Sequence, residues 1–315
     1  MKTIFYSFSI FFLILSCKQN TSNSTMSTHH KPPKAKQISK ELSIHGDVRI
    51  DEFYWLNDRE NSQVINYLNE ENNYYETKTA HTKKFQEDLF EEMKSRIKED
   101  DSSVPYKYND YWYITRYEKG KDYPIYTRKK ESLDAKEELL FDCNEMAKGH
   151  SFFNLRSINV SPDNMLIAFA LDTIGRRQYT LHIKDLKTNT ILKDKVDNCT
   201  GGSTWANDNR TLFYTLKNKT TLRSEAIYKH KLGSDSKEDQ LVFEEKDETF
   251  GVGVYKTKSK EFLVISSYST LTTEFQILNA NTPDGKFKVF QPRTRGLEYS
   301  ISHYGDSFYV LSNAD

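Results

Sequence analysis

The chain has 315 residues, enough for one large domain or two smaller ones. Its 45 Lys and Arg balance its 45 Asp and Glu, so its charge gives no reason to expect a nucleic acid or a strongly charged partner. The 20 Tyr and 19 Phe favour a mainly β globular protein, because these rings pack well on a pleated surface.

The first residues predict a lipoprotein leader. The apolar run from Ile4 to Leu15 is too short for a membrane span and is typical of a signal peptide. A small residue and then Cys17 follow it, which resembles a bacterial lipobox, where the cysteine is lipidated. We therefore expect residues 1–16 to be a lipoprotein signal peptide, Cys17 to carry a lipid anchor, and the chain to lie in the bacterial cell envelope. An ordinary secretory signal is the alternative.

Residues 17–40 are polar, contain Pro32-Pro33 and have no apolar period, which predicts a flexible tether. His29-His30 lies in this tether and is more typical of a solvated tail than of a metal site.

A helical segment follows, within residues 41–100. The stretch from Asn57 to Asp100 contains no Gly or Pro, which favours one long helix or two consecutive helices over about 60–98. Apolar residues of its second half recur every four positions and so share one helix face: Phe85, Leu89, Met93 and Ile97. Such a stripe indicates packing against another element rather than a ligand site.

Residues 101–315 repeat one phrase. "NVSPDNMLIAFA" from Asn159 and "TWANDNRTLFYT" from Thr204 each place an Asp-Asn turn before an apolar strand. Centres of such strands recur every 45 to 55 residues: Trp112, Ile167, Leu212, Phe262 and Phe308. Further strands follow about 15 residues after the first four centres, around Tyr126, His182, Tyr228 and Ile277. A third strand and a linking strand complete each unit.

Four strands per unit at this spacing match the blade of a β-propeller. A β-sandwich has no reason to keep such a repeat, and a β-helix has much shorter rungs. The predicted fold is mainly β: an incomplete propeller over residues 101–315, with about four blades and the start of a fifth. Because Phe308 lies close to Asp315, we expect a fragment, or blades supplied from elsewhere.

Several long stretches then carry a family resemblance. They resemble the N-terminal part of the oligopeptidase B (protease II) branch of the prolyl oligopeptidase family of serine peptidases, and the likeness runs from about residue 31 to the last. The stretches are Glu41–Glu60, Arg96–Lys130, Gly149–Leu181 and Phe213–Asp235.

The resemblance implies a seven-bladed propeller covering an α/β-hydrolase domain, with the N-terminal helices packed on the hydrolase. It implies that the propeller admits short peptides and excludes folded proteins. It also implies that the peptide bond is cleaved after Lys or Arg. The Ser-Asp-His triad and the acidic specificity residues lie in the C-terminal hydrolase domain of the family, so no catalytic residue can be carried onto this chain.

The residues themselves agree with that division. A hydrolase nucleophile sits in a G-x-S-x-G elbow, and no such motif occurs. The nearest approach is "GGSTWA", where we interpret Ser203 as a turn residue. We expect His81, His182 and His230 to be structural or exposed. We expect no catalytic residue, no cofactor and no metal site.

A few residues leave alternatives open. Arg176-Arg177 and Arg223 could line the propeller mouth or tunnel, or face a hydrolase domain, and solvated loop charges are the favoured interpretation. Cys143 and Cys199 could form a disulfide in an oxidising compartment, whereas free buried thiols are somewhat favoured.

Three functional hypotheses remain. The first is the propeller portion of a lipid-anchored serine oligopeptidase, inactive alone, whose partners are short peptides, a hydrolase domain and the membrane. The second is a non-enzymatic, lipid-anchored propeller binding module. The third is a split enzyme with a separately encoded catalytic half.

Overall fold

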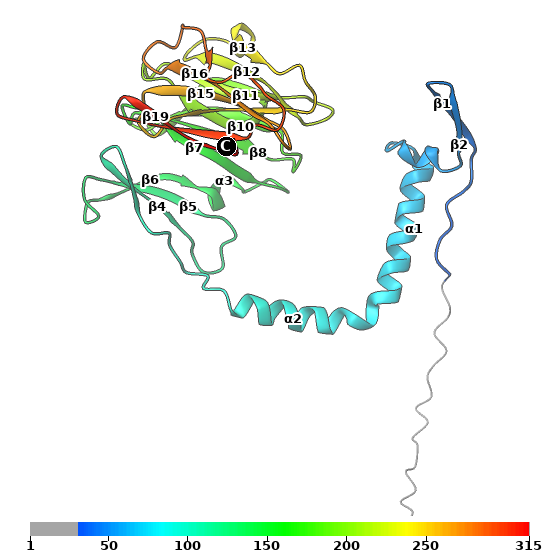
Figure 1. Ribbon diagram of the computed structural model, residues 1–315. Coiled ribbons are helices and arrows are strands. Elements are labelled where there is room, and N and C mark those ends of the chain that lie inside the picture. The colour runs from blue at the N-terminus through cyan, green and yellow to red at the C-terminus, as the bar shows by residue number, and fades with distance from the viewer. Residues whose placement is uncertain (1–30, 315) are drawn as a thin grey trace, which may run out of the picture. The chain divides into compact units, whose positions relative to one another are not determined.

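The computed structural model describes residues 31–314, which fall into two compact units (Figure 1). The first unit ends at Ile97 and the second begins at Lys98. The predicted signal peptide and Cys17 lie outside the described residues. Within residues 31–314, no helix has the length and apolar character needed to cross a membrane.

The first unit begins with a hairpin that the sequence analysis did not predict. Strands β1 (Lys40–Ile44) and β2 (Asp47–Asp51) pair antiparallel around His45-Gly46, and both turn residues have left-handed backbone at φ 52° and 82°. Two such residues form the tight turn that suits a two-residue hairpin. Apolar residues alternate along both strands (Leu42 and Ile44, Val48 and Ile50), but neither strand has a buried face.

The two consecutive helices are present. After a 3₁₀ turn (η1, Tyr54–Asn57), α1 spans Ser62–Thr79, a second 3₁₀ turn (η2) spans Ala80–Thr82, and α2 spans Lys83–Ser95. The Asn61 side chain accepts a hydrogen bond from the Gln63 backbone N–H at 2.9 Å and caps the start of α1. No residue of α2 is buried.

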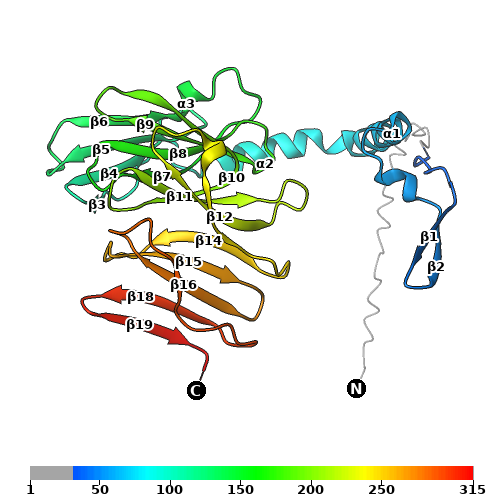
Figure 2. The same ribbon diagram turned by 90° about the horizontal axis from the view of Figure 1, so that it is seen from above.

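The second unit is a succession of antiparallel sheets (Figure 2). The first sheet contains β3 (Tyr106–Tyr108), β4 (Tyr111–Arg116), β5 (Ile125–Lys130) and β6 (Glu137–Asp142). A short helix, α3 (Cys143–Met146), leads to the central sheet, made of β7 (Asn154–Val160), β8 (Leu166–Asp172), β9 (Tyr179–Asp185), β10 (Thr190–Trp205), β11 (Thr211–Lys217), β12 (Ser224–Lys231) and β13 (Gln240–Glu244).

Two further sheets follow. The 3₁₀ turn η3 (Ser236–Glu238) lies between β12 and β13. The next sheet contains β14 (Gly251–Lys256), β15 (Phe262–Tyr268), β16 (Thr273–Asn279) and β17 (Lys288–Val289), and the last contains β18 (Tyr299–Tyr304) and β19 (Ser307–Ser312). The five predicted apolar centres lie in β4, β8, β11, β15 and β19, the second strand of each repeat, which confirms the predicted repeat.

The second and third repeats share one strand. The 16-residue β10 is the outermost strand of the second repeat and the innermost of the third, with a break in register between Cys199 and Ser203. Gly201 has φ +87° at this break, and a Cβ there would lie 3.3 Å from the Tyr179 ring. Glycine therefore allows the chain to bend without ending the strand. The two repeats consequently form one seven-stranded hydrogen-bonded sheet.

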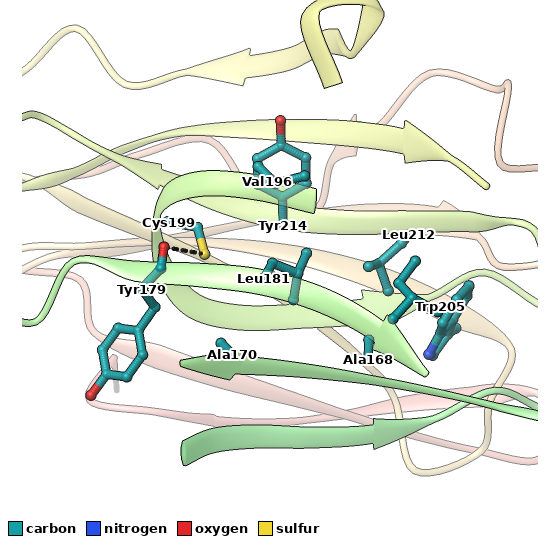
Figure 3. Packing of buried hydrophobic residues seen from close by; sticks show 10 residues of the cluster. Ala168, Ala170, Tyr179, Leu181, Val196, Cys199, Trp205, Leu212 and Tyr214 are labelled. Carbon is teal, nitrogen blue, oxygen red and sulfur yellow. Dashed lines mark hydrogen bonds between the residues drawn. The ribbon is translucent and has the colours of Figure 1, made fainter. Parts of the chain in front are cut away.

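The core lies between neighbouring repeats. In β8, Ile167 and Phe169 pack against the first repeat, whereas Ala168 and Ala170 pack against the third. Strand geometry requires this, because successive side chains point to opposite faces. Figure 3 shows the second-to-third interface, including the Cys199 thiol donating to the Tyr179 carbonyl at 3.2 Å. The remaining interfaces repeat the pattern: Phe213 with Leu263 and Ile265, and Val264 with Tyr299 and Ile301.

A buried charged cluster joins the second and third repeats. The His230 side chain is 1% exposed, and its ring nitrogens lie 2.7 Å from Asp239 Oδ1 and 3.0 Å from Asp194 Oδ1. Tyr214 donates to the other Asp239 oxygen at 2.9 Å. Burial alone lowers the pKa of His230, but the hydrogen bonds to the two carboxylates outweigh it, and the pKa is raised.

This cluster predicts a pH-dependent stability. Protonated His230 stabilises the fold fully below its unfolded pKa of about 6.5, and this contribution is lost as pH rises through the raised folded-state value. His230→Gln should therefore lower the free energy of unfolding by about 2–3 kcal/mol near pH 6 and by less near pH 9, as measured by urea denaturation.

His182→Gln is the matched control. Burial, reinforced by the Lys195 charge, lowers the pKa of His182, so the wild-type contribution of this residue is present above about pH 6.5 and is lost as pH falls. The loss of unfolding free energy caused by His182→Gln should become smaller as the pH falls, whereas the loss caused by His230→Gln should become larger. Parallel pH profiles for the two variants would contradict the assignment.

Candidate functional site: the axial cavity

The five repeated turns share one backbone conformation. Each joins the innermost strand of a repeat to the next strand and holds one residue in the left-handed region at φ between 50° and 66°. Asn tolerates this conformation better than other non-glycine residues, which explains the repeated Asp-Asn phrase. The residues are Asn109, Asn164, Asn209, Lys260 and Gly305.

Four of these turns bond to one another, and we call them the turn ring. The Asn109 amide donates to Asn164 Oδ1 at 3.1 Å, and the Asp163 backbone N–H donates to Asn209 Oδ1 at 2.9 Å. The Asn207 amide donates to the Lys260 carbonyl at 2.9 Å, and the Lys260 ammonium donates to Asn109. The contacts run from the first repeat through the second, third and fourth, and back to the first.

The turn ring borders a cavity of about 560 Å³. Its walls come from the innermost strand of each of the first four repeats: β3, β7, the end of β10, and β14. Its lining includes four lysines and no Asp or Glu: Lys107, Lys256, Lys258 and Lys260. We call this space the axial cavity.

Lys256 is the most perturbed of these lysines. Burial, reinforced by the Lys260 charge and opposed by Asp208, lowers its pKa to about 8. The Lys256 ammonium donates to Asn207 Oδ1 at 2.8 Å, and the Lys260 ammonium lies 5.0 Å from the centre of the Tyr108 ring. Among the described residues, none of the four lysines forms an ion pair with a carboxylate.

Two buried hydroxyls on the cavity wall have no hydrogen-bond partner. They are those of Tyr113, 5% exposed, and Ser203, 7% exposed. The prediction of Ser203 as a turn residue was wrong, because Ser203 lies within β10 and pairs with Tyr214 of β11. The strand resumes at Ser203, immediately after the bend at Gly201. The turn-like glycines before Ser203 therefore form only this bend.

The arginines singled out in the sequence lie away from the cavity. Arg176 and Arg177 are exposed in the β8–β9 loop. The interpretation of Arg223 as a solvated loop charge was wrong, because this residue is partly buried and its guanidinium donates to the carbonyls of Glu245 at 3.3 Å and Phe250 at 3.0 Å. It therefore ties the third repeat to the segment entering the fourth.

The cysteines and histidines have structural environments or are exposed. Cys143 and Cys199 are free and buried, and burial raises the pKa of these thiols to about 12 and about 11. His81 is exposed, and the His182 ring stacks on Phe169 at 5.5 Å. No cluster of metal-ligating side chains occurs within residues 31–314.

The cavity lysines were not predicted from the sequence. "YKTKSK" gathers Lys256, Lys258 and Lys260 within five residues, at the end of β14 and in the turn that follows it. That pattern was a usable signal. The contribution of Lys107 could not be predicted from the sequence, because only the stacking of repeats brings the first repeat opposite the fourth.

Comparison with known proteins places the chain in a family. The domain described as "Prolyl oligopeptidase, N-terminal beta-propeller domain" matches residues 32–315. The chain belongs to the prolyl oligopeptidase family. The match covers almost all the described residues and agrees with the repeats seen in the structure.

Individual relatives agree with this assignment. The chain is 39% identical to dipeptidyl aminopeptidase BI of Pseudoxanthomonas mexicana and 34% identical to protease 2 of Moraxella lacunata, covering 90% of this chain and 42% of each relative. Oligopeptidase B from Leishmania major superimposes with a TM-score of 0.82 at 30% identity, over 90% of this chain and 43% of that one. The chain thus spans less than half the length of these relatives.

The turn ring gives a test of its own. Asn209→Ala should lower the free energy of unfolding by about 2 kcal/mol, because alanine is strained in the left-handed region and the hydrogen bond to Asp163 is lost. Asn209→Gly keeps the backbone freedom and should cost about 1 kcal/mol. Urea denaturation measures both.

The control is Asn189→Ala in the β9–β10 turn. Asn189 also has a left-handed backbone, at φ 59°, but bonds to no neighbouring repeat among the described residues. Its replacement should therefore cost less than Asn209→Ala. Equal costs would show that the bond between repeats contributes nothing.

Proposed function

We propose that this chain is the N-terminal propeller portion of a serine-type oligopeptidase that hydrolyses short peptides after Lys or Arg. The observation that carries the proposal is the 0.82 TM-score to an oligopeptidase B over 90% of the chain. Oligopeptidase B of Trypanosoma brucei, with covalently bound antipain, supports it with a TM-score of 0.81 at 27% identity.

In this proposal the catalytic groups come from a C-terminal domain of the kind found in full-length members of the family. Residues 31–314 supply no triad of their own. Ser259 Oγ lies 2.9 Å from His303 Nδ1, but no carboxylate among the described residues orients this imidazole. The Phe262 ring packs edge-on against His303 at 4.7 Å, which favours a structural contact between the fourth and fifth repeats.

The apolar face of α2 supports packing on such a domain. Five apolar side chains lie along this helix and its C-terminal end, and all are exposed, from 40% at Leu89 to 67% at Phe85 and Ile97. Monomeric proteins rarely expose so many neighbouring apolar groups without a partner. The face comprises Phe85, Leu89, Phe90, Met93 and Ile97.

The remaining parts of the proposal concern access and location. Stacked sheets around an axial cavity would limit the site to short peptides, since a folded protein cannot pass between them. A lipid on Cys17 would hold the protein to the bacterial cell envelope, in line with the apolar run before that residue.

The alternative is a lipid-anchored propeller that binds a partner and catalyses nothing. The exposed face of α2 favours the peptidase, because an independent binding module has no use for it. The relative named dipeptidyl aminopeptidase BI also makes the mode of cleavage a point to test.

Hydrolysis by the complete protein, comprising this chain and its catalytic domain, tests the proposal. We expect release of coumarin from an N-blocked peptide ending in Arg–coumarin, and at least a hundredfold less from the same peptide ending in Glu. Turnover only of unblocked dipeptide substrates would favour dipeptidyl release. No turnover of either substrate would favour the binding module.

The helix face gives a second test. In the complete protein, Phe85→Ser should lower the free energy of unfolding by about 2 kcal/mol, because a buried ring is lost from the interface. In the 315-residue chain the same change should cost under about 0.5 kcal/mol, because the side chain is already 67% exposed. Glu87→Ser, on the other side of α2, is the control and should change neither protein.

A further inference from the structure

The axial cavity combines charge without counter-charge and hydrogen-bond donors without acceptors. Its lining holds four lysines and no carboxylate, and the hydroxyls of Tyr113 and Ser203 are buried in its wall with no partner. A buried polar group left unpaired is costly, so such groups are expected to meet a ligand or water. Lysine ammoniums and hydroxyls are donors to an anion.

We propose that the axial cavity binds the carboxylate of a short peptide, held by Lys256 and Lys260. Both ammoniums already lie at the turn ring, where Asn207 and Asn109 orient them through side-chain hydrogen bonds. A carboxylate between them would offset the burial and the Lys260 charge that now lower the pKa of Lys256.

The shape of the cavity favours a peptide over a small inorganic ion. Its volume of about 560 Å³ lies in the range of roughly 300–1,000 Å³ found for organic ligands. Tyr106, Tyr108 and Tyr255 give it aromatic walls, against which peptide side chains can pack. The choice of a peptide rests on the proposed function, whereas the choice of an anion rests on the lysines alone.

The carboxylate has two possible sources, the C-terminus of a peptide or an acidic side chain. Isothermal titration calorimetry on the 315-residue chain with Ala-Ala-Ala, its C-terminal amide, and acetyl-Ala-Glu-Ala-amide distinguishes them. We expect the peptide with the preferred carboxylate, either Ala-Ala-Ala or acetyl-Ala-Glu-Ala-amide, to bind at least tenfold more tightly than Ala-Ala-Ala-amide. Equal binding of all three peptides, no binding, or tighter binding of inorganic phosphate would overturn the proposal.

Variants locate the site. Lys256→Gln and Lys260→Gln should each weaken binding of the preferred peptide about tenfold. Lys288→Gln removes the same charge from β17, the outermost strand of the same sheet, and should leave binding unchanged. Circular dichroism verifies that each variant is folded, and equal losses in all three would show a non-specific charge effect.

Proton uptake gives an independent readout. A bound carboxylate favours the charged form of Lys256, so peptide binding near pH 8 should be accompanied by proton uptake. This uptake is measured as a binding enthalpy that varies with the ionisation enthalpy of the buffer. Lys260, Lys258 and Lys107 face the same cavity, with Asp208 nearby, and Lys256→Gln should abolish most of the uptake. Uptake unchanged in Lys256→Gln would contradict the assignment. Because binding needs no catalysis, its failure and the failure of the peptidase proposal are separate results.

Discussion

Each full sheet of the second unit has apolar side chains on both faces, so each needs a neighbour on either side. The second strand of the second repeat shows the constraint most plainly, because Ile167 and Ala168 are fully buried and point to opposite neighbours. A single four-stranded sheet cannot satisfy this requirement alone, which is why such repeats stack. The order of the sheets, the four apolar clusters between them and the position of the axis all follow from that requirement.

Stacking also creates the axial cavity. The innermost strands meet at the axis, and the turns that follow them are held together by Asn side chains whose backbone conformation the sequence encodes locally. What the sequence does not encode locally is the meeting of Lys260 with Asn109, which lie 151 residues apart. The concentration of positive charge is therefore a property of the assembled repeats. In the binding proposal it links the fold to function, because a cavity lined by lysines and by no Asp or Glu would favour anionic ligands.

Much of the fold could be predicted from periodicity, and less of the site could. The strands around Ile167 and Leu212 were predictable, because local alternation and Asp-Asn turns mark them. The β1–β2 hairpin was missed, although apolar residues alternate along both of its strands and a His-Gly turn joins them. The second and third repeats share β10 because Gly201 lets this strand bend without ending. The turn-like glycines at the bend led to the wrong assignment of Ser203 to a turn. The structural role of Arg223 depends on carbonyls more than 20 residues away, which no short pattern reveals.

Amide hydrogen exchange on the 315-residue chain tests the central claim, that sheets covered on both faces form the stable part of the protein. Strands covered on both sides should open only through global unfolding, whereas uncovered elements should open locally. The prediction is that β8, β11 and β15 share the highest free energy of exchange and that β1 and β2 exchange far faster. Exchange of β11 as fast as that of β1 would contradict the account.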